Sequence, residues 1–131
     1  MRSGPFFLKL ITKNMESKQV LIYDNQHCFS RLLKKVFGRD THFKIYKKFD
    51  EKSNLDDLRE KYSFVFFMIY SEDDLFDYLL LHDRDIPIVV CSFNQKILNQ
   101  FGKISNINLI DISQAKPELV KRFDFFLKSY A

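Results

Sequence analysis

Short apolar runs alternate with segments of helical periodicity along most of this chain, and this alternation constrains the fold more than any other feature. Four runs rich in Val, Ile and Phe lie at residues 20–23, 64–70, 88–91 and 107–112, and each precedes a segment that can form a helix. Residues 43–49 alternate apolar with polar side chains, as a strand with one exposed face does. The resulting order of five strand–helix units predicts an α/β fold, a three-layer α/β/α sandwich around a five-stranded parallel sheet.

Helical spacing of apolar residues predicts which side of each helix faces the core. Helices are predicted over residues 26–37, from residue 53 to 61, from Ser71 onward, over 94–101 and over 117–130. In the helix after Ser71, the predicted buried stripe consists of Leu75, Phe76, Leu79 and Leu80. In the last helix, the predicted buried stripe consists of Leu119, Val120, Phe123, Phe126, Leu127 and Tyr130. Phe125 lies on the opposite side of that helix, close to Lys121 and Arg122.

Composition sets the domain organisation and excludes several classes of site. A chain of 131 residues is long enough for one domain, which we expect to span residues 18–131, with residues 1–17 as an N-terminal arm or leader. Three glycines cannot build a glycine-rich phosphate loop, so no nucleotide cofactor is expected. Cys28 and Cys91 have no nearby ligands at metal spacing, so we expect free thiols, no metal site and a cytoplasmic location. No apolar run is long enough to cross a membrane.

Charge is distributed unevenly along the chain. Residues 1–48 carry 11 Lys and Arg against 3 Asp and Glu, whereas residues 49–85 carry 4 against 11. A basic N-terminal third of this kind is able to contact nucleic acid or an acidic partner. Because its cations are spread over a tail, a helix and a strand, we interpret it first as a solvated surface.

Polar side chains follow three of the predicted strands at the edge where ligands of parallel sheets bind. These are Asp24 and Asn25 after the first strand, Ser71 after the central strand, and Ser92 after the fourth. One acid is few for a catalytic cluster, so a binding or signalling module is expected rather than an enzyme. An enzymatic alternative would use Asp24 and Ser92.

Three segments of the chain resemble the bacterial response-regulator receiver domain, and the likeness covers nearly all of residues 18–130. Residues 18–25 (KQVLIYDN), 61–68 (KYSFVFFM) and 86–92 (IPIVVCS) resemble its first, third and fourth strands. The resemblance implies a receiver or flavodoxin-like (βα)5 fold. It places Asp24 and Asn25 at the acid pair, Met68 at the phosphoacceptor aspartate and Ser92 at the hydroxyl position. It makes Lys116, before Pro117, the candidate for the lysine of the family.

The departures from the receiver pattern remove the groups that bind the cation and accept the phosphoryl group. A receiver holds a hard divalent cation with three carboxylates, and here the positions carry one carboxylate, an amide and a thioether. Methionine cannot form an acyl phosphate. We therefore expect a degenerate receiver that is not phosphorylated and acts by binding a protein partner or itself. The resemblance implies contact through the last helix and the neighbouring strand, with Phe125, Lys121 and Arg122 at the interface. The alternatives are a nucleic-acid-binding accessory domain and a small flavodoxin-like enzyme.

Overall fold

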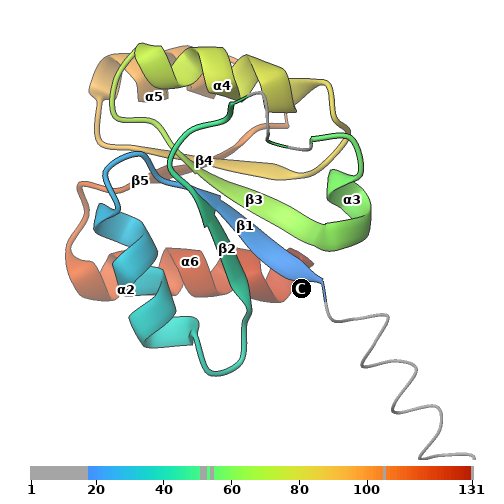
Figure 1. The fold of residues 1–131 in the computed structure, drawn as a ribbon. Helices are drawn as coiled ribbons and strands as arrows, with labels where there is room; N and C mark the ends of the chain where they lie inside the picture. The colour runs from blue at the N-terminus through green and yellow to red at the C-terminus, as the bar shows by residue number, and fades with distance from the viewer. Residues whose placement is uncertain (1–17, 51–52, 54, 105, 131) are drawn as a thin grey trace, which may run out of the picture.

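Five parallel strands form a single sheet in the order β2-β1-β3-β4-β5 (Figure 1). The structure is a computed structural model that describes residues 18–50, 53, 55–104 and 106–130. The strands are β1 (Gln19–Tyr23), β2 (Phe43–Tyr46), β3 (Tyr62–Met68), β4 (Ile88–Ser92) and β5 (Asn108–Asp111). The predicted parallel sheet is confirmed. The arm predicted for residues 1–17 lies outside the described residues.

Helices cover both faces of the sheet and complete the three layers (Figure 1). One face carries α2 (Cys28–Phe37) and α6 (Lys116–Tyr130), and the other carries α3 (Leu58–Lys61), α4 (Asp73–His82) and α5 (Gln95–Gly102). The three-layer architecture is therefore confirmed. The short helix predicted from residue 53 begins only at Leu58.

The sheet separates two hydrophobic cores, and β3 contributes to both. Phe64, Phe66 and Met68 point toward α2 and α6, whereas Val65 and Phe67 point toward α4 and α5. All five side chains are fully buried, so this strand is covered on both faces. Ring contacts join the sheet to its two layers. Phe66 meets Phe123 of α6 edge-on at 5.1 Å, and Phe67 meets Tyr78 of α4 edge-on at 5.7 Å between ring centroids.

The orientation predicted for the last helix is confirmed. Phe123 is wholly buried and Phe125 is 56 % exposed, as the helical spacing requires.

The orientation predicted for the helix after Ser71 is wrong. In α4 the buried residues are Asp74, Asp77 and Leu81. Phe76 is 71 % exposed, Leu79 and Leu80 are also exposed, and Leu75 is only half buried. The helix is therefore rotated so that much of its predicted core stripe faces outward.

In the described part of the chain, no helix is both long and apolar enough to span a membrane.

Candidate functional site

The carboxyl ends of β1, β3 and β4 bring together residues that the sequence placed at the site. Tyr23 pairs with Phe67 across β1 and β3, so the next residue, Asp24, lies level with Met68. Ser92 is the last residue of β4 and lies beside Asp111 of β5. Parallel strands place their ends at one edge of the sheet, which is why residues distant in sequence meet here.

Asp24 is fully buried, and both of its carboxylate oxygens accept hydrogen bonds. Oδ2 accepts from the backbone N–H of Phe29 at 2.9 Å and of Ser30 at 2.8 Å, the first turn of α2. Oδ1 accepts from the hydroxyl of Tyr70. Unpaired N–H groups at a helix start favour a carboxylate acceptor, so Asp24 fixes the start of α2 to the end of β1.

The turn between Asp24 and α2 explains how the carboxylate reaches the helix. His27 stands at the N-cap with φ of 59°, a left-handed conformation, and its side chain makes no capping hydrogen bond. The backbone N–H of His27 donates to the carbonyl of Asp24 at 3.3 Å, which folds the chain back on itself. Asp24 therefore supplies the cap that His27 does not.

Two further buried acids, Asp74 and Asp77 of α4, extend this polar cluster. Oδ2 of Asp74 accepts from the backbone N–H of Tyr70 at 2.8 Å, and its Oδ1 accepts from Asn25 Nδ2 at 3.3 Å. Asp77 Oδ2 accepts from the hydroxyl of Tyr23 at 2.6 Å and from the backbone N–H of Phe49 at 3.1 Å. These bonds turn the acidic side of α4 toward the sheet, which is the physical reason why its leucines face outward.

Burial and nearby acids also shift the two tyrosines of the cluster. Burial raises the pKa of Tyr70, and the hydrogen bond to Asp24 and the charge of that carboxylate raise it further. Burial likewise raises the pKa of Tyr23, with added contributions from its hydrogen bond to Asp77 and the charge of that acid. Both hydroxyls are therefore held as protonated donors to carboxylates.

The remaining residues of the receiver pattern differ in their surroundings. Met68 is wholly buried in the core beneath α2 and α6. The Ser92 hydroxyl donates to the carbonyl of Ile69 at 2.7 Å and accepts from the backbone N–H of Asn94 at 3.1 Å. Lys116 is exposed at the first position of α6, and no side-chain hydrogen bond or ion pair of the described residues involves it. The structure thus brings Asp24, Asn25, Met68 and Ser92 to one edge but gives Lys116 no contact there.

Within the described ranges, no group of three or more His, Cys, Asp and Glu side chains is arranged to hold a metal ion. Every buried side-chain nitrogen and oxygen of those residues already has a hydrogen-bond partner. The hydrogen bonds of Asp24, Asp74 and Asp77 therefore hold α2 and α4 against the ends of β1 and β3.

Comparisons with protein-family models, with curated proteins and with solved structures found no match to this chain.

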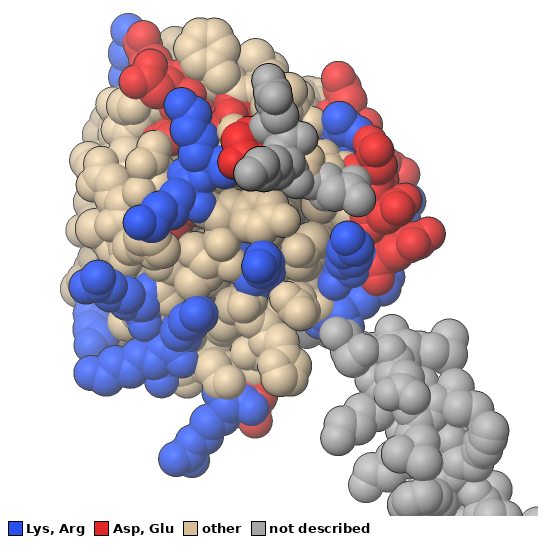
Figure 2. All heavy atoms as spheres, viewed as in Figure 1, with Lys and Arg blue, Asp and Glu red and all other residues tan. Residues whose placement is uncertain are grey.

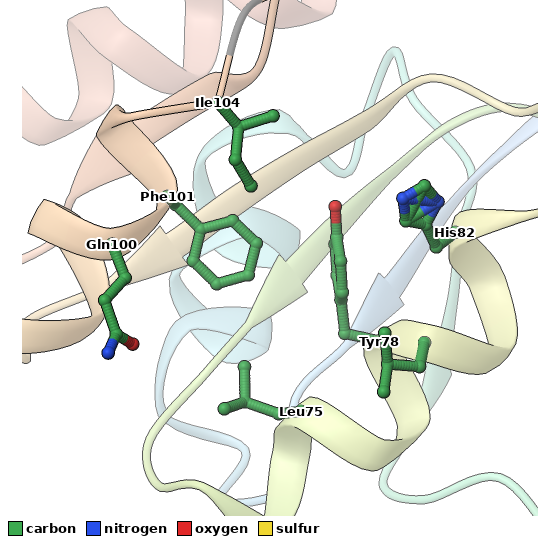
Figure 3. A pocket seen from close by; sticks show the side chains of 7 residues that line it. Leu75, Tyr78, His82, Gln100, Phe101 and Ile104 are labelled. Atoms are coloured by element: carbon green, nitrogen blue, oxygen red, sulfur yellow. The ribbon is translucent and has the colours of Figure 1, made fainter.

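A groove of about 380 Å³ lies between α4 and α5 (Figure 3). In Figure 3 the side chains of Leu75 and Tyr78 on α4 lie opposite Phe101 on α5. The full lining consists of Leu75, Tyr78, Leu79, His82, Gln100, Phe101 and Ile104. The sequence did not predict this groove because it assigned Leu75 and Leu79 to the core.

At the residues predicted as an interface on α6, charged side chains lie beside the exposed phenylalanine. The Arg122 guanidinium lies 5.8 Å from the ring centroid of Phe125, and the Phe126 ring meets Phe125 edge-on at 5.2 Å. Lys121 lies 3.8 Å from Glu118 in an exposed ion pair. Phe125 is therefore exposed but partly shielded by its neighbours.

Sequence reasoning missed Asp74 and Asp77 as buried groups. The available signal was their spacing with Leu81, since residues three and four apart share one face of a helix. Three leucines and a phenylalanine in the same helix formed a stronger apolar pattern, and this pattern predicted the wrong side of the helix as buried.

Proposed function

We propose that the protein is a non-catalytic, receiver-like regulatory module that binds a protein partner and is not phosphorylated on aspartate. The observation that carries the proposal is the state of the carboxyl edge of the sheet. The position matching the phosphoacceptor holds Met68, which is buried, and the acid that remains, Asp24, is buried and hydrogen-bonded through both oxygens.

The requirements of phosphoryl transfer to a carboxylate support this proposal. Phosphoryl transfer to a carboxylate needs an accessible oxygen and a hard cation to neutralise the developing charge. Asp24 already has three donors, and Met68 offers a thioether sulfur, a poor ligand for magnesium. A phosphoryl group on Oδ2 of Asp24 would displace the N–H groups of Phe29 and Ser30 and disrupt the start of α2, and one on Oδ1 would displace the hydroxyl of Tyr70.

Intact-mass spectrometry after treatment with acetyl phosphate and magnesium tests the proposal. We expect no added phosphoryl mass, whereas a phosphorylatable receiver domain treated in the same batch gains one. Peptide mapping would locate any modification. A stoichiometric adduct on Asp24 would overturn the proposal.

We further propose a cytoplasmic location in a signalling assembly. Cys28 and Cys91 are both free thiols, which a reducing compartment maintains.

A basic surface supports a second candidate function, binding of nucleic acid. Cations gather over α2 and β2 at the lower left of the face shown in Figure 2. In residues 26–49 the only acid is Asp40, and the exposed cations are Arg31, Lys34, Lys35, Arg39, Lys44, Lys47 and Lys48. None of these cations belongs to an ion pair among the described residues. Lysines on an edge strand such as β2 also prevent unwanted strand pairing, so we rank this candidate second.

A salt series separates the two candidates. Binding of a fluorescent single-stranded oligonucleotide is measured by anisotropy at increasing salt concentration. The second candidate predicts an affinity that falls steeply with salt, and a shallower slope in the Lys34→Gln, Lys35→Gln double variant. The first candidate predicts no binding at physiological salt.

The enzymatic alternative receives no comparable support. No hydrogen bond joins Asp24 to Ser92 among the described residues, and the Ser92 hydroxyl is directed to the carbonyl of Ile69. Turnover of any substrate that Asp24→Ala abolishes without unfolding the chain would favour this alternative over the first.

A further inference from the structure

The outer edge of β2 is open in the part of the chain that the structure describes. β2 stands at one end of the strand order and pairs there with β1 alone. The carbonyls of His42 and Tyr46 accept hydrogen bonds from β1 and from the residue that follows it. Because backbone groups alternate sides along a strand, the N–H and C=O groups of Phe43 and Ile45 point away from the sheet. An edge of this kind is a template for a further strand.

Two hollows follow one another along β2, and both are lined by cations. One of about 370 Å³ is lined by residues 41–43 and the end of α2, and one of about 520 Å³ by residues 44–48, Asp50 and Ser53. Asp50 already accepts a hydrogen bond from the Ser53 hydroxyl at 3.2 Å. The cations gather over α2 and β2 (Figure 2). All are exposed and none belongs to an ion pair with a described residue; they are Lys34, Lys35, Arg39, Lys44, Lys47 and Lys48.

The charge of this edge selects the kind of strand that is able to pair with it. Lysines on an edge strand oppose pairing with a second copy of that strand, because like charges would then lie opposite one another. The same lysines favour a strand that carries carboxylates. One set of cations therefore excludes uncharged and basic strands and admits acidic ones, which is a source of specificity.

The open backbone favours a peptide over nucleic acid at this surface. A peptide strand offers both N–H and C=O groups to an edge strand, whereas phosphates offer acceptors to the lysines and no donors to the carbonyls of β2. Single-stranded nucleic acid also gains affinity by stacking its bases on aromatic rings. The rings of Phe43 and Tyr46 are half-buried and pack against the two cores instead.

We propose that the outer edge of β2 is the site at which the protein partner docks, through an extended acidic segment that adds to the sheet as a further strand. The backbone of this segment pairs with Phe43 and Ile45, and its carboxylates lie beside the cations of the two hollows. This inference rests on the proposed function, because it names the surface and the chemistry by which the regulatory module holds its partner.

Fluorescence anisotropy with the full chain at physiological salt tests the strand pairing. The probe is a short labelled peptide in which Glu alternates with Thr. A copy with every backbone nitrogen methylated keeps the charge of the probe and loses its donors. We expect saturable binding of the first peptide, binding of the methylated copy that is weaker by about tenfold or more, and no binding of a peptide with Lys in place of Glu. No binding of the Glu peptide, or equal binding of its methylated copy, overturns the proposal.

Amide hydrogen exchange shows where the peptide binds. Exchange of the Phe43 and Ile45 amides should slow when the Glu peptide is added, because these N–H groups point outward and gain a partner. Exchange of the Lys44 amide, which points toward β1, should change little. If a single-stranded oligonucleotide displaces the peptide and the amides of Phe43 and Ile45 stay unprotected in both complexes, the surface is a nucleic-acid site and the proposal is overturned.

Removal of charge tests the part played by the lysines. The Lys44→Gln, Lys47→Gln double variant should raise the dissociation constant of the Glu peptide by about threefold to tenfold. The matched control is Lys96→Gln, Lys103→Gln, which removes the same charge from α5 and its end, beside β4 and β5. The control should bind the peptide as the wild-type chain does. Both variants should melt as the wild-type chain does, because all four side chains are exposed. Equal weakening in the two variants contradicts docking at β2.

The two proposals fail separately. Absence of peptide binding leaves the intact mass after acetyl phosphate treatment unchanged, whereas an adduct on Asp24 leaves the peptide titration standing.

Discussion

Two helices, α4 and α6, each expose a phenylalanine, but different forces set their orientation. In α6 the apolar stripe faces the core, and Phe125 is left outside beneath Arg122. In α4 two carboxylates face the sheet, and Phe76 is left outside beside other exposed apolar side chains. Hydrophobic periodicity decides the rotation of a helix when nothing polar competes with it. Where acids meet buried donors at the end of a sheet, the hydrogen bonds decide instead.

The largest expected effect tests the orientation of α6. Phe123→Asp buries a charge against Phe66 in the core, and the loss should exceed about 4 kcal/mol, enough to unfold a domain of ordinary stability. Circular dichroism should show loss of the folded signal. A cooperative melt close to that of the wild-type chain would mean that α6 is rotated from the orientation described.

The next effect tests the orientation of α4. Asp77→Ala removes the acceptor of Tyr23 and Phe49 and should lower the free energy of unfolding by about 2 kcal/mol or more. Leu80→Ala, in the same helix, should change it by only about 0.5 kcal/mol, because Leu80 is exposed. Urea denaturation measures both. The reverse ranking would restore the orientation that hydrophobic spacing predicts.

An intermediate effect concerns alkaline pH. Burial raises the pKa of Tyr62 to about 12, and the pKa values of Tyr23 and Tyr70 are raised as well. The pKa of tyrosine in an unfolded chain is about 10, so the folded state retains these protons to a higher pH than the unfolded state does. The stability that they contribute is therefore fully present below pH of about 10 and is lost as pH rises toward the folded pKa values.

Urea denaturation at several alkaline pH values measures this loss. The Tyr70→Phe variant serves as control and should show a shallower decline than the wild-type chain, because it lacks one of the shifted groups. Equal slopes for the two proteins would show that the pKa of Tyr70 is not raised in the folded chain.

The smallest effect on stability is expected at Phe125. Phe125→Asp should shift the free energy of unfolding by only about 0.5 kcal/mol, because the side chain is more than half exposed. The receiver resemblance implies that this variant weakens self-association or binding of a protein partner through the last helix and the neighbouring strand. Thermal melts measured with and without the substitution provide the test. A large loss of stability would place Phe125 in the core.

Much of the fold follows from the sequence because it depends on local periodicity. The alternation of apolar runs and helical segments was sufficient for the sheet, its layers and the central position of β3. The uninterrupted apolar run at residues 64–70 shows why, since only a strand covered on both faces tolerates one.

The candidate site was less predictable because its contacts join residues far apart in the chain. Asp24 meets Tyr70, and Tyr23 meets Asp77, across 46 and 54 positions of sequence. Local patterns carry no information about such pairs until the strand order is known. The residue types alone suggested a weakened receiver pocket, whereas the structure places Asp24 at the start of α2 as its cap.

Amide NMR spectra recorded with and without magnesium and beryllofluoride test the central claim most directly, that the acids at the carboxyl edge are structural. The reporters are the N–H groups of Phe29 and Ser30, which donate to Asp24, and that of Tyr70, which donates to Asp74. These three signals should not move on addition of the phosphoryl analogue. Saturable shifts of the Phe29 and Ser30 signals would show that Asp24 leaves the helix to bind it, and would contradict the account.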